Sequence, residues 1–172
     1  VHESDGFCAA LPYFLYTNSF KNLKAIISLV CTSKISIKYG LAKFYLIDLA
    51  LKKNKSPINT FVRKYKNNSY FKEVVQGIQY TKRFKNKSHS SMVKKLGISC
   101  RYPGTFNSSV HAIIKSKSYK QAILKTIRAG GCNCSRSNFI GSYFSALKGF
   151  EAIPSNWITK CVHSKKIIKI GK

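Results

Sequence analysis

The sequence predicts an all-α protein, folded as a compact bundle of several helices. Apolar residues recur at helical spacing through most of the 172 residues, and no stretch of useful length alternates apolar and polar residues as a half-buried strand does. Glycine, proline and capping residues separate these stretches, where helices are expected to end and begin. The 11 phenylalanines and 10 tyrosines supply enough apolar surface for a real core.

The first part of the chain contains three such segments. Asp5 is placed to cap a helix whose apolar stripe spans residues 7–15, in which Pro12 predicts a kink. A second helix is expected over residues 20–30. The spacing 35, 39, 42, 46, 49 then predicts a long helix over 35–53, with Asp48 as a partly buried structural acid.

The remaining helices follow from start and stop signals. Ser56-Pro57 is a strong helix start, and a helix with apolar residues between 71 and 78 follows it. Residues 81–91 are basic and polar, so we expect an exposed loop with His89 at the surface. Further helices are expected over 105–115, capped by Thr105, over 118–129, and over 135–149, the last with Ile140, Phe144 and Leu147 buried.

The chain is strongly basic, with 31 lysines and arginines against five acidic residues and a formal net charge of +26. Such a charge is typical of a polyanion partner such as RNA, DNA or an acidic membrane surface. Lysine far outnumbers arginine, however, although arginine is favoured for bidentate phosphate contacts, and the lysines are spread along the whole chain. We therefore favour a compositional origin for the charge, with nucleic acid as an alternative partner.

The cysteines do not predict a disulfide framework or a zinc site. Cys132 and Cys134 form a CxC pair, but no second pair and no nearby histidine complete a set of four zinc ligands. The other cysteines are scattered and are expected to act as small buried hydrophobic residues: Cys8, Cys31, Cys100 and Cys161.

One stretch carries a specific pattern, residues 129–157, which read AGGCNCSRSNFIGSYFSALKGFEAIPSNW. Paired glycines end a helix, a short polar loop follows, and a helix of small residues leads to Ile-Pro and Trp157. This pattern resembles the ADP-ribosylglycohydrolase family, in the branch of the J-crystallins and selenoprotein J, where a Gly-Gly-Asp loop precedes a helix of the form xxGAxxGAxxGxxxIPxxW. The resemblance implies an all-α bundle of that type, here with its N-terminal part missing.

The resemblance also implies which residues bind ligand. In the family, a Ser-Asp-Gly or Ser-Asn-Gly motif and the Gly-Gly loop line the ADP-ribose site. The positions that match here are Ser4, Asp5, Gly6, Gly130, Gly131, Cys132, Asn133, Cys134, Ser135 and Arg136. By this correspondence, the loop would face ADP-ribose or another phosphate-bearing ligand.

Hydrolytic members of the family hold two Mg2+ ions with carboxylates, because hard cations prefer oxygen ligands. Here Cys132 occupies the first acidic position of the loop, and Cys134 stands where many members have the second. Thiolates are soft and bind Mg2+ poorly. The family's upstream Gly-Asp and Thr-Asp-Asp segments have no match after Val1. We therefore predict no metal ligand, no catalytic residue and no bound Mg2+ in this chain.

Three functions remain open from the sequence. The chain is a crystallin-like, non-hydrolytic member of the family, the C-terminal part of an active hydrolase, or a basic scaffold that binds RNA or a large assembly. A nucleophilic role for Cys132 or Cys134, with His111 as base, ranks below these. Because the chain begins at Val1, we expect a fragment or processed product, with a partial domain over 1–163 and a frayed basic tail over 164–172. No signal peptide or spanning segment is evident, so we expect a cytoplasmic protein with no membrane span.

Overall fold

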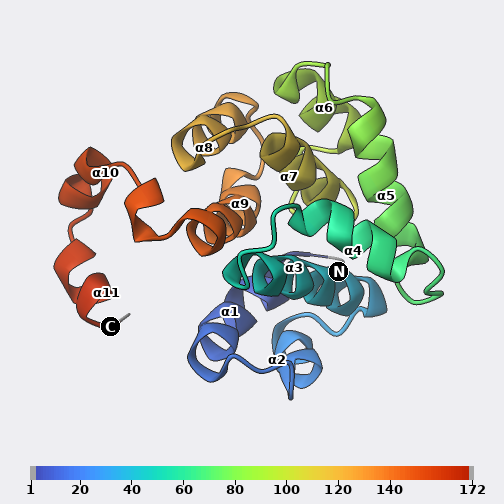
Figure 1. Ribbon diagram of the computed structural model, residues 1–172, viewed down its shortest axis with the longest axis horizontal. Coiled ribbons are helices and arrows are strands. Elements are labelled where there is room, and N and C mark those ends of the chain that lie inside the picture. Colours follow the sequence, from blue (N-terminus) through green and yellow to red (C-terminus); the bar gives the residue numbers. More distant parts are fainter. Residues whose placement is uncertain (1–2, 171–172) are drawn as a thin grey trace.

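The computed structural model describes residues 3–170, which form a helical bundle without a β-strand (Figure 1). The all-α prediction is therefore confirmed. The elements are α1 (Asp5–Thr17), α2 (Leu23–Val30), α3 (Lys34–Leu51), α4 (Pro57–Tyr65), α5 (Lys72–Arg83), α6 (His89–Leu96), α7 (Gly104–Ile114), α8 (Tyr119–Arg128), α9 (Asn133–Lys148), the 3-10 turn η1 (Phe150–Ala152), α10 (Ser155–Lys160) and α11 (Ser164–Ile170).

The centre of the bundle is built from α3 and α9, which pack against each other. Helices α1, α2 and α4 also contact α3, while α7 and α8 contact α9. Aromatic rings fill the space between these helices. Phe44 of α3 lies 4.9 Å from Phe7 and 5.0 Å from Phe14, and Phe139 of α9 lies 5.9 Å from Phe106, between ring centroids. The rings join the N-terminal and C-terminal halves of the chain into one core.

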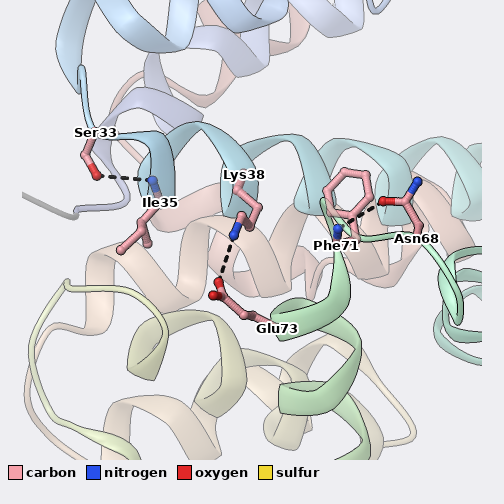
Figure 2. Close-up of polar contacts among 6 residues, drawn as sticks. All are labelled: Ser33, Ile35, Lys38, Asn68, Phe71 and Glu73. Carbon is pink, nitrogen blue, oxygen red and sulfur yellow. Dashed lines mark hydrogen bonds and ion pairs between the residues drawn. The ribbon is translucent and has the colours of Figure 1, made fainter.

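Polar contacts at its flanks hold α3 in place (Figure 2). The Ser33 hydroxyl accepts a hydrogen bond from the backbone N–H of Ile35 at 3.2 Å, which caps the start of α3. Further along the helix, Lys38 Nζ lies 2.8 Å from the Glu73 carboxylate, so an ion pair links α3 to α5. The predicted structural role of Asp48 is consistent with its ion pair to Lys52, at 2.9 Å.

The small residues of α9 allow close packing, as its sequence predicts. Ile140 and Phe144 are buried, whereas Leu147 at the end of the same face is half-buried. A Cβ built on Gly141 would lie 3.4 Å from the hydroxyl of Tyr119, so α8 and α9 are in van der Waals contact there. The prediction of a buried face is confirmed for Ile140 and Phe144.

Three local predictions are wrong. Residues 81–91 are not one loop, because α5 continues to Arg83 and α6 begins at His89. Thr105 does not cap α7; it is buried in the first turn, and Pro103 holds the cap position without a side-chain hydrogen bond. Asp5 does not cap α1; it is the first residue of that helix, and Ser4 holds the cap position without a side-chain hydrogen bond. Residues 164–170 form the short helix α11, which has no buried residue, and the expected fraying of the tail stays a prediction.

Helices α10 and α11 lie to one side of the bundle, joined to it through η1 at the end of α9 (Figure 1). The boundary predicted after residue 163 coincides with the start of α11 but stays a prediction. Residues 1–2 and 171–172, the outer ends of the two predicted segments, lie outside the described residues. Among the helices described, none combines the length and the apolar character that crossing a bilayer requires.

Candidate functional site

The two segments that were matched to a ligand site lie at the starts of α1 and α9. The two helices contact each other through Phe7 of α1 and Phe139 of α9, whose rings pack edge to face with 5.9 Å between their centroids. The charges of Cys8 on α1 and of Cys132 and Cys134 at the start of α9 are close enough to affect one another. The fold therefore brings the Ser4–Gly6 motif and the Gly-Gly loop to the same region of the molecule.

Lys43 of α3 is a buried basic residue of this region. Its side chain is 0% exposed, and Nζ donates a hydrogen bond to the Ser4 hydroxyl at 2.5 Å. The ammonium also lies over the rings of Phe7, Tyr102 and Phe139, at 4.6, 5.0 and 5.4 Å from their centroids. Such cation–π contacts partly replace the water that burial removes.

Burial shifts the titration of this cluster. Loss of water lowers the pKa of Lys43 to about 7, against the smaller opposing effects of Cys8, Asp5 and Cys132. Burial likewise raises the pKa of the Cys8 thiol, an effect that nearby Lys43 reduces. The Tyr102 hydroxyl, 3.3 Å from the Ser4 hydroxyl, has its pKa raised well above the usual value by burial. Near neutral pH, Lys43 is thus poised between its charged and neutral forms.

The Gly-Gly loop is held against the segment that precedes α7. Gly130 and Gly131 have φ values of +75° and +70°, the left-handed conformation that favours glycine. A Cβ on Gly131 would lie 2.3 Å from the carbonyl oxygen of Ile98, whereas one on Gly130 would meet no atom within 4 Å. The next residue, Cys132, donates its backbone N–H to that same Ile98 oxygen at 2.7 Å. Close approach of two backbones therefore requires glycine at 131.

Three side chains at the start of α9 form a small polar group. Cys132 Sγ lies 3.6 Å from Cys134 Sγ and 3.2 Å from Ser135 Oγ. Burial acts to raise the pKa of Cys132, but the Ser135 hydroxyl and N–H and the thiols of Cys134 and Cys100 can hydrogen-bond to the thiolate, and the net effect is a lowered pKa. Cys132 is half-buried and Cys134 is exposed.

Arg136 supports the loop from inside the protein. Its side chain is 0% exposed; Nε donates to the Thr126 hydroxyl at 3.2 Å, and Nη2 donates to the Gly130 carbonyl and, at 3.0 Å, to Asn133 Oδ1. The other matched residues differ in exposure. Asp5, Gly131 and Cys134 are exposed, Gly130, Cys132 and Asn133 are half-buried, and Ser4, Gly6 and Ser135 are buried.

A buried histidine pair continues this network away from the loop. His89 Nδ1 lies 3.1 Å from His111 Nδ1, and His89 Nε2 lies 3.2 Å from the same Thr126 hydroxyl that Arg136 contacts. His111 Nε2 contacts the Phe84 carbonyl at 3.2 Å. Burial lowers the pKa of His89 to about 3, with smaller effects from His111 and Arg136. The prediction that His89 lies at the surface is wrong, since it is 4% exposed.

The cysteine predictions are confirmed only in part. Cys31 is buried as a small hydrophobic residue, Cys8 and Cys100 are half-buried, and Cys161 is exposed. Cys161 follows the last residue of the peripheral helix α10, Lys160. Among the described residues all six cysteines are free thiols.

The residues of this region do not fit a Mg2+ pair. Within residues 3–170 no three Asp, Glu, His or Cys side chains are grouped so that they could hold a metal ion. The loop offers two thiols and the Asn133 amide, whose oxygen is already bonded to Arg136. The guanidinium of Arg136 and the ammonium of Lys43 add positive charge beside it, which would oppose a dication.

The all-α bundle agrees with the family indicated by the sequence. The profile of that family, ADP-ribosylglycohydrolase, matches residues 27–172, and the chain belongs to this family. Two curated relatives are similar over shorter stretches, both from Tripedalia cystophora. Crystallin J1A is 34% identical over 85 residues, and Crystallin J1B is 30% identical over 77 residues.

These matches span 49% and 45% of this chain, but only 26% and 24% of the two crystallins. The chain thus covers about a quarter of the length of the curated relatives it matches.

Proposed function

We propose that this chain is a crystallin-like member of its family that binds ADP-ribose, or a closely related phosphate-bearing ligand, without Mg2+-dependent hydrolysis. The observation that carries the proposal is the meeting of two motif segments, distant in sequence, above the buried Lys43. The ligand would lie across the starts of α1 and α9, in contact with the exposed Asp5, Gly131 and Cys134.

Electrostatics supports an anionic ligand at this place. Helices α1 and α9 have 13 and 16 residues, and their N-termini carry backbone N–H groups and the positive ends of the helix dipoles. Arg136, and Lys43 in its charged form, add positive charge beneath the surface. The Asp5 carboxylate is an acceptor suited to ribose hydroxyls. The phosphates would therefore bind near the helix N-termini and the basic residues, and the ribose hydroxyls near Asp5.

The side chains of the loop are poor ligands for Mg2+, so we do not expect metal-dependent hydrolysis by these residues. Two dications need several carboxylates to offset their charge and replace their water, and the loop supplies cysteine, asparagine and serine instead. A single acid in the loop would still face Arg136 and Lys43. We therefore propose retained binding rather than retained catalysis.

Calorimetric titration with ADP-ribose tests the binding. We expect heat of binding in the presence of EDTA, and an unchanged affinity when Mg2+ replaces EDTA. The variant Cys134→Phe places a bulky ring on the exposed loop and should weaken binding at least tenfold. Cys161→Phe makes the same exchange at an exposed cysteine just after α10 and should leave the affinity unchanged. No binding by the wild-type chain, or equal weakening by both variants, would refute the proposed site.

The hydrolase alternative predicts a different result. If the chain contributes only part of an active site, the missing carboxylates must come from residues outside this chain. ADP-ribose binding would then depend on Mg2+ only in a longer protein that includes those residues. Comparing the Mg2+ dependence of binding in the two proteins separates this alternative from the non-hydrolytic proposal.

A further inference from the structure

The start of α9 carries a pair of thiols that the proposed ligand site does not use for chemistry. Cys132 Sγ and Cys134 Sγ are 3.6 Å apart, and neither is bonded to another cysteine. A disulfide needs an S–S distance of about 2.05 Å, so the two sulfurs must approach by roughly 1.5 Å. The pair is thus near bonding distance while still reduced.

We propose that Cys132 and Cys134 form a reversible dithiol–disulfide pair that responds to a peroxide oxidant, with Cys132 as the sulfur attacked first by the oxidant and Cys134 as the resolving thiol. Two independent features distinguish this pair from the remaining cysteines. Their sulfurs lie 3.6 Å apart in one loop that is half-buried at Cys132 and exposed at Cys134, and the Ser135 hydroxyl lies 3.2 Å from Cys132 Sγ, where it can stabilise a thiolate. Cys31, by contrast, is buried in the apolar core.

The reaction balances in two steps. The Cys132 thiolate attacks one peroxide oxygen, the O–O bond breaks, and hydroxide leaves and takes up a proton as water, which leaves Cys132 as a sulfenic acid. The Cys134 sulfur then attacks the Cys132 sulfur, the S–O bond breaks, and a second water leaves with the proton of Cys134. The two sulfurs lose two electrons and the peroxide gains them. A dithiol reductant reverses the change by thiol exchange.

The surroundings favour Cys132 as the first site of oxidation. Its lowered pKa increases the fraction of thiolate, the form that reacts, whereas burial raises the pKa of Cys8 and of Cys100. Cys100 is a second thiol whose hydrogen bonding affects the pKa of Cys132. It lies two residues after Ile98, whose carbonyl accepts a hydrogen bond from the loop, and it is only half-buried. It therefore provides an alternative partner that the experiment must separate.

The sequence makes the test direct. Trypsin cuts after Arg128 and Arg136, so both thiols fall in one peptide, AGGCNCSR, which contains no other cysteine. The reduced chain is treated with hydrogen peroxide without any ligand, its remaining thiols are alkylated, and the digest is analysed by mass spectrometry. We expect this peptide two hydrogens lighter and without alkyl groups, and we expect dithiothreitol treatment before alkylation to restore both alkylation sites.

Matched variants decide the assignment. Cys132→Ser and Cys134→Ser should each abolish the two-hydrogen loss in this peptide, while Cys161→Ser, at another exposed cysteine, should leave it unchanged. Circular dichroism verifies that each variant is folded. The proposal is overturned if the wild-type peptide remains fully alkylated while Cys161 is oxidised, or if Cys132 appears in a disulfide with Cys100 instead. Because no ligand is present, neither outcome depends on ADP-ribose binding.

Discussion

Lys43 offers a quantitative test of the buried cluster beneath the site. In the folded chain its pKa is about 7, against an ordinary value of 10.5, because burial removes water from the ammonium. At a pH between these two values, Lys43 is mostly protonated in the unfolded chain and mostly deprotonated in the folded chain. Stability must therefore rise as pH rises through this window, and the contribution of Lys43 is least favourable below about pH 7.

The size of the effect follows from the shift. One pH unit of differential protonation is worth about 1.4 kcal/mol, and at about pH 7 the folded lysine is already half deprotonated. Between about pH 7 and 9, Lys43 should therefore add roughly 2 kcal/mol to the free energy of unfolding. Lys43→Met removes the titrating group but keeps a long side chain among Phe7, Tyr102 and Phe139, so the variant should lose this pH-dependent gain.

Urea unfolding at about pH 7, 8 and 9, with reductant present, measures the difference. Cys8, Cys100 and Cys132 also have shifted pKa values, but they are present in both proteins, so the comparison between variant and wild type isolates most of the Lys43 effect. Lys120→Met, on the exposed side of α8, should keep the wild-type slope. Equal pH slopes for wild type and Lys43→Met would show that Lys43 is not buried as described.

Three further predictions concern the loop, the histidine pair and the surface charge. Gly131→Ala should destabilise the chain by about 2–4 kcal/mol in urea unfolding, because residue 131 has a positive φ and a Cβ there would clash with Ile98. Gly130→Ala should cost only about 1–2 kcal/mol, because residue 130 has a similar φ but open space around it. Equal costs for the two variants would contradict the close approach of Gly131 to Ile98. The pKa of His89 falls from 6.5 to about 3 on folding, so the unfolded chain binds more protons and stability should drop by about 1.4 kcal/mol per unit between about pH 6 and 4. His89→Leu should flatten that drop, and an unchanged pH profile would refute the assignment. Binding of single-stranded RNA, measured by fluorescence anisotropy, should be weak and vanish by about 200 mM salt; tight binding at that salt would favour the basic-scaffold alternative.

The helices were largely predictable because their signals are local. Apolar spacing and glycine or proline stops place α3, α7, α8 and α9 within about two residues of the expected ends. The small-residue helix α9 and its Gly-Gly start were predictable from the same segment. Ser118 confirms the pattern, since its hydroxyl accepts the Gln121 N–H at the start of α8.

The buried polar groups were not predictable, because their partners lie far away in the sequence. Lys43 is one of many lysines until Ser4 and Tyr102 are brought to it. His89 sits in a basic polar stretch, yet its ring is buried between His111 and Thr126. Arg136 likewise has the sequence context of an exposed loop, and only the folded chain shows its side chain beneath that loop. Local pattern carries no information about such long-range hydrogen bonds.

The central claim, binding without metal-dependent hydrolysis, is tested most directly by an assay of ADP-ribose release from an ADP-ribosylated peptide, with Mg2+ and with EDTA. We expect no Mg2+-dependent release by this 172-residue chain. We also expect none from Cys132→Asp, because one restored acid leaves the loop without the carboxylates that two dications require. Release that depends on Mg2+ and is abolished by Cys132→Ala would contradict the account of the site.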